Sequence, residues 1–177
     1  MKNNQAKFDY IKSHWYLDAG VIYSQRTGKA LAFSVVNESG RRSQIITRNG
    51  EKKSLNIQVH QAIWMLSNNQ PIPEGFVIHH LDLDFTNNAP ENLILLSKRA
   101  HQFYHRYIKG AKGYSYVPSS SKVKPWMARV SLPIGRVIAR HCGTEEEARA
   151  FVLKHQSPTL KALKAKGCLL LEDIAIN

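Results

Sequence analysis

The residues best suited to chemistry lie between Val77 and His105. An apolar, strand-forming pair leads into two adjacent histidines, His79 and His80. A run of Asp, Thr, Asn and Pro residues follows, and this composition favours a loop. His101 and His105 are four residues apart, so on a helix their side chains would share one face. Three or four imidazoles that meet at one point would form a site for a divalent metal ion.

A particular order of elements is needed to bring these imidazoles together. The four apolar residues 93–96 are suited to a second short strand after the polar loop. Ser97 can cap a helix whose early turns carry His101 and His105. The sequence therefore predicts a strand, a long loop, a short strand and a helix. If the helix folds back, its histidine face meets the His79–His80 end of the first strand.

This stretch resembles the HNH motif of ββα-metal endonucleases, in the form found in phage and intron-encoded homing endonucleases. The resemblance rests on one run in which the residue types and their spacing both agree, His79-His80-Leu81-Asp82-Leu83-Asp84-Phe85-Thr86-Asn87-Asn88-Ala89-Pro90-Glu91-Asn92-Leu93. The third position of the motif falls on His101. Leu83 departs from the pattern, because the family usually has Gly there, and this bears on how tight the first turn is.

The resemblance implies a role for each matching residue. His80 would be the general base that activates water, while His79 and His101 would be metal ligands. Asn92 would pin the loop and orient His80. The additional candidates are His105, as a ligand or phosphate contact, and Asn88, as a support of the loop. The implied cofactor is one divalent ion, with Mg²⁺ favoured and Mn²⁺, Zn²⁺ or Ni²⁺ as alternatives.

The charge of the chain indicates a polyanionic partner. Its 177 residues contain 25 Lys and Arg against 13 Asp and Glu, and the pI is about 9.9. This excess favours nucleic acid, and with the motif it predicts double-stranded DNA. No apolar run reaches membrane-spanning length and no signal peptide is visible, so we expect a cytoplasmic protein, in the host cytoplasm if a phage encodes it. A monomer and a homodimer both remain open.

The first 109 residues are interpreted as one HNH endonuclease domain of α+β class. Residues 1–13 are polar and expected to be loose or weakly helical, and residues 14–59 predict an antiparallel β-meander with a hairpin turn at Asn49-Gly50. His60 begins a helical segment and is interpreted as structural. The ββα-metal core is placed at 76–108, and its closing helix carries Arg99 and Arg106 as candidate contacts to the DNA backbone.

Residues 113–155 predict a second module, a three-stranded sheet packed on one helix. The helix begins with a capping box, in which Thr144 is the N-cap and Glu147 the third helical residue. The module resembles the AP2 DNA-binding domain through Gly113, Tyr114, Trp126, Ala128, Arg129, Gly143, Thr144, Glu145-Glu146-Glu147-Ala148 and Ala150. The resemblance implies that the sheet enters a major groove, where bases and phosphates would be contacted by Arg129, Arg136 and Arg140. A C-terminal tail, 156–177, is expected to begin with a short helix at Ser157.

Each feature alone has a simpler interpretation. A His-His pair is usually incidental, two asparagines in a loop usually form a turn, and a pair of histidines four residues apart usually lies on a helix surface. Their joint spacing favours a metal-dependent DNA endonuclease. The alternatives are a non-cleaving, sequence-specific DNA-binding protein on an HNH scaffold and a metal-binding protein of another purpose. Homing, restriction and packaging roles are not distinguished.

Overall fold

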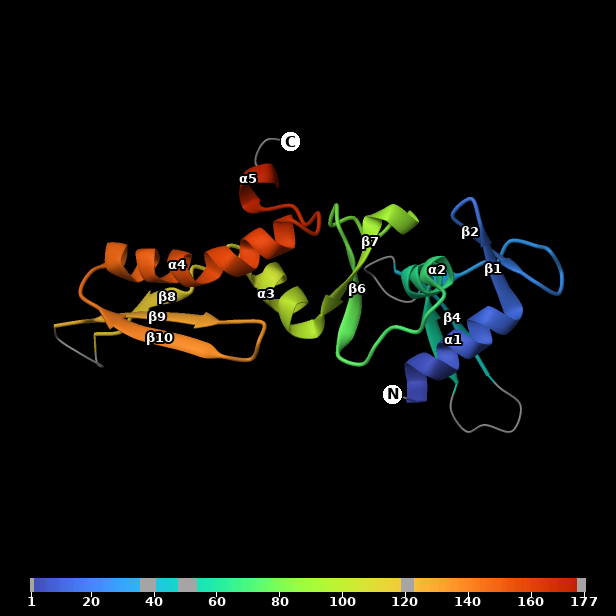
Figure 1. Ribbon diagram of the computed structural model, residues 1–177, viewed down its shortest axis with the longest axis horizontal. Helices are drawn as coiled ribbons and strands as arrows, with labels where there is room; N and C mark the ends of the chain where they lie inside the picture. Colours follow the sequence, from blue (N-terminus) through green and yellow to red (C-terminus); the bar gives the residue numbers. More distant parts are fainter. Residues whose placement is uncertain (1, 36–40, 48–53, 119–122, 175–177) are drawn as a thin grey trace. The chain divides into compact units, whose positions relative to one another are not determined.

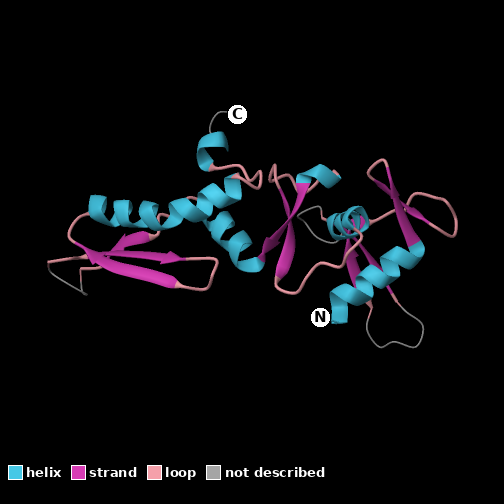
Figure 2. Cartoon of the chain, in the orientation of Figure 1, coloured by secondary structure: helices cyan, strands magenta, loops and turns pink. Residues whose placement is uncertain are grey.

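The computed structural model describes residues 2–35, 41–47, 54–118 and 123–174, so the Asn49-Gly50 turn lies outside the described residues. The chain divides into two compact units, Met1–Leu96 and Ser97–Asn177. Both units combine helices with small sheets of two or three strands (Figures 1 and 2). The fold is thus of mixed α and β type, as the sequence predicts.

The first unit begins with a helix, α1 (Lys2–His14), followed by a hairpin of β1 (Trp15–Asp18) and β2 (Val21–Ser24). Phe8 and Ile11 lie three residues apart on α1 and are both buried in the core, which explains why this polar segment is ordered as a helix. Ala19 and Gly20 both have positive φ, the conformation of a tight hairpin turn.

The expected meander is divided between two sheets. The second sheet has the order β3 (Ser34–Val35), β4 (Arg42–Ile46), β5 (Leu55–Gln58) and is antiparallel throughout. Between β2 and β3 the chain makes a turn in which Gly28, at φ +64°, donates to the Ser24 carbonyl at 2.8 Å. After this turn the chain returns to β2 through an isolated bridge between Tyr23 and Ala30, and no third strand of the first sheet forms among the described residues.

An apolar helix and a β-hairpin complete the first unit. Helix α2 (Val59–Asn68) buries Ala62, Ile63, Trp64 and Met65, and ends at Asn69 in the left-handed conformation. Strand β6 (Phe76–His80) pairs with β7 (Leu93–Ser97), and a 3₁₀ turn, η1 (Pro90–Asn92), precedes β7. The predicted order of strand, loop and strand is therefore present.

The second unit begins with α3 (Lys98–Ile108), where the Ser97 hydroxyl accepts from the Ala100 amide at 3.2 Å, as the predicted cap requires. Its antiparallel sheet has the order β10 (Val137–Cys142), β9 (Trp126–Ser131), β8 (Tyr114–Tyr116). The long helix α4 (Glu145–Lys164) lies along one face of this sheet (Figure 2). Ala128 and Val130 of β9 are buried there.

Helix α4 (Glu145–Lys164) corrects the expectation of a separate helix from Ser157, because it continues through Pro158. The Glu147 amide donates to the Thr144 hydroxyl at 3.2 Å, so the predicted N-cap is formed. A proline inside a helix costs about 3 kcal/mol. Leu160 and Leu163 are buried beyond it, and each contributes roughly 1.5–3 kcal/mol, which offsets that cost. The last helix is short, α5 (Leu171–Ile174).

Across the described ranges, none of the helices combines the length and the apolar character that crossing a membrane would need.

Candidate functional site

The loop between β6 and β7 is held by the side chain of Asn92, which is 8% exposed. The Asn92 amide oxygen accepts from the Asp82 backbone N–H at 3.1 Å. Its amide nitrogen donates to the Asp82 carboxylate at 2.9 Å and to the Asn87 carbonyl at 2.8 Å. The backbone adds a bond from the Leu81 N–H to the Asn92 carbonyl at 2.9 Å. One buried amide therefore ties the end of the loop to its beginning and its middle.

Two carboxylates in this loop also serve its shape. Asp82 accepts from the Asn87 side chain at 2.7 Å, and Asp84 accepts from the Thr86 hydroxyl at 2.7 Å. Desolvation works against ionisation of Asp82, but hydrogen bonds from Asn92 and Asn87 outweigh it and lower the pKa. The hydrogen bonds from Thr86 lower the pKa of Asp84 in the same way. Both groups are therefore ionised at neutral pH.

Leu83 lies in the left-handed region, with φ +66°, at the turn that follows the two histidines. Its N–H donates to the His80 carbonyl at 3.2 Å. A side chain with a Cβ is strained there by roughly 1–2 kcal/mol. Leucine therefore adopts at this turn the backbone conformation that glycine adopts more easily.

His80 is 6% exposed, and its ring is held by Asn88. The His80 Nε2 lies 3.2 Å from the Asn88 amide oxygen. The Asn88 amide nitrogen donates to the Thr86 carbonyl at 3.0 Å, so the amide oxygen is the atom that faces the histidine. An amide oxygen can only accept, and Nε2 must therefore carry the proton. Nδ1 is left as the basic nitrogen of the neutral ring.

The hydrogen bonds give Asn88 and Asn92 roles that differ from those expected from the sequence. Asn92 bonds the loop at Asp82 and Asn87, whereas Asn88 is the residue that bonds His80. Spacing alone could not distinguish them, because both lie in the same loop and the choice depends on how that loop folds.

His60 is a further neighbour of the site that sequence reasoning left as structural. Its ring centroid lies 5.3 Å from that of His80 in an edge-to-face arrangement, and it is 7% exposed. Burial lowers the pKa of His60 to about 3, with smaller electrostatic contributions from His80, Arg41 and Lys7. His60 is thus neutral at physiological pH and packs against His80 without adding a charge.

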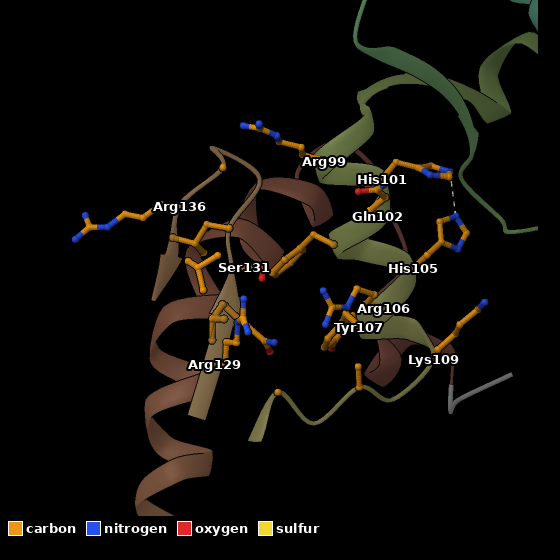
Figure 3. Close-up of a pocket in the computed structure, with 18 residues that line it drawn as sticks. Arg99, His101, Gln102, His105, Arg106, Tyr107, Lys109, Arg129, Ser131 and Arg136 are labelled. Atoms are coloured by element: carbon orange, nitrogen blue, oxygen red, sulfur yellow. Dashed lines mark hydrogen bonds between the residues drawn. The ribbon is translucent and has the colours of Figure 1, made fainter. Parts of the chain in front are cut away.

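The second unit presents a pair of imidazoles on α3. The Nε2 atoms of His101 and His105 are 3.1 Å apart, and both rings are half-buried (Figure 3). Two imidazole nitrogens bound to one ion at about 2.1 Å would lie roughly 3.0–3.4 Å apart. The observed separation fits that requirement. This face of α3 therefore suits metal binding, as the predicted spacing of four residues implied.

The cationic candidates of the second unit fall into two groups. Arg99, Arg106, Arg129 and Arg136 line one open cleft of about 540 Å³ (Figure 3). Arg140 projects elsewhere. In the register of β9 and β10 it stands opposite Ala128, on the face that packs on α4, whereas Arg129 stands opposite Ala139 and projects from the other face. Arg129 and Arg140 therefore project from opposite faces of the sheet and do not belong to one DNA-contacting surface.

Residues 58–103 match the family model described as HNH endonuclease. The chain carries an HNH endonuclease domain. That domain makes the protein an endonuclease, and the matched range contains His79, His80, Asn92 and His101. His105 lies just beyond it, and so do all of residues 113–155.

A solved structure on DNA binding and cleavage by the HNH homing endonuclease I-HmuI aligns with 73% of this chain and 72% of that chain, at 21% sequence identity and a TM-score of 0.42. No match was found among curated proteins.

Proposed function

We propose that this endonuclease hydrolyses phosphodiester bonds of double-stranded DNA, with His80 as the general base and one divalent ion held by His79 and His101. The observation that carries this proposal is the bond from His80 to Asn88. It fixes the tautomer in which Nδ1 can accept a proton from water.

The surroundings of His80 support its change of charge during the reaction. As Nδ1 takes a proton from water, the ring becomes positive and its Nε2–H bond to Asn88 strengthens. The ionised carboxylates of Asp82 and Asp84 interact with His80 electrostatically. His60 stays neutral and adds no opposing charge. Asn92 keeps the loop that carries these groups in one conformation.

The histidines His79, His101 and His105 offer a donor set suited to a divalent ion. We infer that His79 and His101 are the ligands, with His105 as a third donor or a phosphate contact. When bound, the ion would neutralise charge on the scissile phosphate and on the departing 3′-oxygen. Mg²⁺ is the first ion to test, because phosphoryl chemistry commonly uses it, and imidazole donors also suit Mn²⁺, Zn²⁺ and Ni²⁺.

We also propose that residues 113–155 form an AP2-like module that targets the DNA. What supports this is a three-stranded antiparallel sheet with α4 on one face, Arg129 on the other and Arg136 in the turn between β9 and β10. In this arrangement the HNH domain of 1–109 supplies the chemistry and the second module supplies affinity.

Cleavage of supercoiled plasmid tests the proposal. Wild type is incubated with Mg²⁺, with Mn²⁺ and with EDTA, beside His80→Ala and the control His14→Ala, which removes an exposed histidine of α1. We expect relaxed or linear DNA with metal and none with EDTA. His80→Ala should cleave about 10²–10⁴-fold more slowly, and His14→Ala at the wild-type rate.

Two outcomes would overturn this function. If His80→Ala cuts as fast as wild type, His80 is not the base. If wild type binds DNA and cuts with none of the metals tested, the chain is a DNA-binding protein that uses the HNH fold as a scaffold.

A further inference from the structure

The cleft of the second unit has walls of positive charge. Its cations come from two parts of the fold. Arg99 and Arg106 lie on α3, and Arg129 and Arg136 on β9 and the turn after it. All four are exposed, and Lys109 adds a fifth positive charge. None of the described residues that line the cleft is acidic, so the protein itself supplies no carboxylate to balance these charges there.

The contact between Arg99 and Gly135 joins the two walls. Gly135 has φ +86°, and the guanidinium of Arg99 occupies the space that a side chain at this position would need. A glycine in the β9–β10 turn thus lets an arginine of α3 lie directly on the turn. The cleft is therefore a built feature of the unit, with its walls in contact at one end.

Helix α3 presents different chemistry on its two sides. Arg99, Gln102 and Arg106 recur at helical spacing and line the cleft, and Figure 3 shows Arg106 on the side of the helix that faces Arg129. His101 and His105 also line the cleft, and in the same view their rings lie on the side of the helix away from Arg129. One helix thus carries both the imidazole pair and one wall of the cationic cleft.

We propose that this cleft holds the sugar-phosphate backbone of one strand of duplex DNA, so that Arg129 positions the DNA and does not read its bases. Base edges lie at the floor of a groove, and a protein reads them with an element that protrudes. A concave cleft lined by cations instead fits the convex, anionic backbone. The inference rests on the proposed function only in taking DNA as the partner, and it differs from the AP2-based expectation for Arg129.

Equilibrium binding to a pool of duplexes with a random core tests this inference. Binding is measured in EDTA, so that a chain unable to hydrolyse DNA still gives a result. For Arg129→Ala we expect affinity about fivefold weaker at about 0.15 M salt, and the slope of log K against log salt smaller in magnitude by about 0.9. The set of sequences selected from the pool should be unchanged. Arg99→Ala and Arg106→Ala should behave alike.

A conservative variant and a control make the test decisive. Arg129→Lys keeps the charge but loses the two-pronged geometry that guanine recognition needs, so it should retain the wild-type salt slope and sequence preference. Lys154→Ala removes an exposed charge of α4 that does not line the cleft, and should change neither.

Two results would overturn the inference. In one, Arg129→Ala and Arg129→Lys both change the selected sequences, which would make Arg129 a base-reading residue. In the other, Arg129→Ala and Arg99→Ala bind like Lys154→Ala. Loss of cleavage in any variant would bear on the catalytic proposal and not on this one.

Discussion

The loop of residues 81–92 and the cationic cleft of the second unit differ in whether the protein itself supplies partners for their charged side chains. In the loop, Asp82 and Asp84 are bonded by amide and hydroxyl groups of the protein, and Asn92 is buried at its base. In the cleft, the arginines are exposed and no acidic side chain lines the walls among the described residues. The loop is organised before any ligand arrives, whereas the cleft leaves its charge to be balanced by a partner.

Removing the amide that organises the loop should give the largest change. Asn92→Ala removes the three hydrogen bonds of a buried amide, to the Asp82 backbone N–H, the Asp82 carboxylate and the Asn87 carbonyl, which costs about 1–3 kcal/mol in the free energy of unfolding. We expect DNA cleavage to fall roughly 100-fold as the loop loosens. Urea unfolding and a plasmid assay measure the two effects. The matched control is Asn56→Ala, an exposed asparagine of β5, and equal behaviour of the two variants would contradict the role given to Asn92.

Acid should weaken the first unit through His60. Its pKa is about 3 in the folded protein and about 6.5 when unfolded, so between these values the unfolded chain binds the extra proton. Stability is therefore full above pH 6.5 and falls by about 1.4 kcal/mol per pH unit below it, roughly 2 kcal/mol by pH 5. His60→Phe keeps a ring and removes the titration. Urea unfolding at several pH values should show a shallower decline for this variant, and identical slopes would refute the assignment.

Removing the orienting group of His80 should slow the reaction without disturbing binding. Asn88→Ala takes away the acceptor for Nε2, so the ring can rotate and change tautomer. We expect kcat to fall about 10-fold while KM and the urea midpoint stay close to wild type. Asn88→Asp keeps an acceptor oxygen and should restore much of kcat. A change in KM with kcat unaltered would mean that Asn88 binds DNA and does not position the base.

The smallest effect is expected at Leu83. Leu83→Gly relieves the strain of a positive φ but adds freedom to the unfolded chain, so the net gain should be below about 1 kcal/mol. Leu83→Val places a β-branched residue in the same conformation and should lose stability. Cleavage should survive the glycine. A glycine variant less stable than the valine variant would show that the turn is not strained.

The sequence predicted the local elements better than their mutual contacts. His79-His80, the polar loop, the strand from Leu93 and the helix carrying His101 all follow from local spacing and composition, and the structure has them. The sequence predicts that Asn92 pins the loop and orients His80. Asn92 does hold the loop, but the side chain bonded to His80 is Asn88, because that choice depends on how the loop folds.

The faces of Arg129 and Arg140 also depend on contacts that the local sequence does not determine. Alternation within one strand gives the face of Arg129 relative to Ala128, but the face of Arg140 depends on the register across the β9–β10 turn. The continuation of α4 through Pro158 likewise depends on the burial of Leu160 and Leu163, which local rules for proline do not include.

Titration with Mn²⁺ tests most directly whether His79 and His101 hold the same ion. Calorimetry would compare wild type, His79→Ala, His101→Ala and the double variant. We predict one ion per chain in wild type, a loss of roughly 10-fold or more in affinity for each single variant, and little further loss when both are combined. Binding that neither single variant weakens, or losses that add in the double variant, would contradict a shared ion.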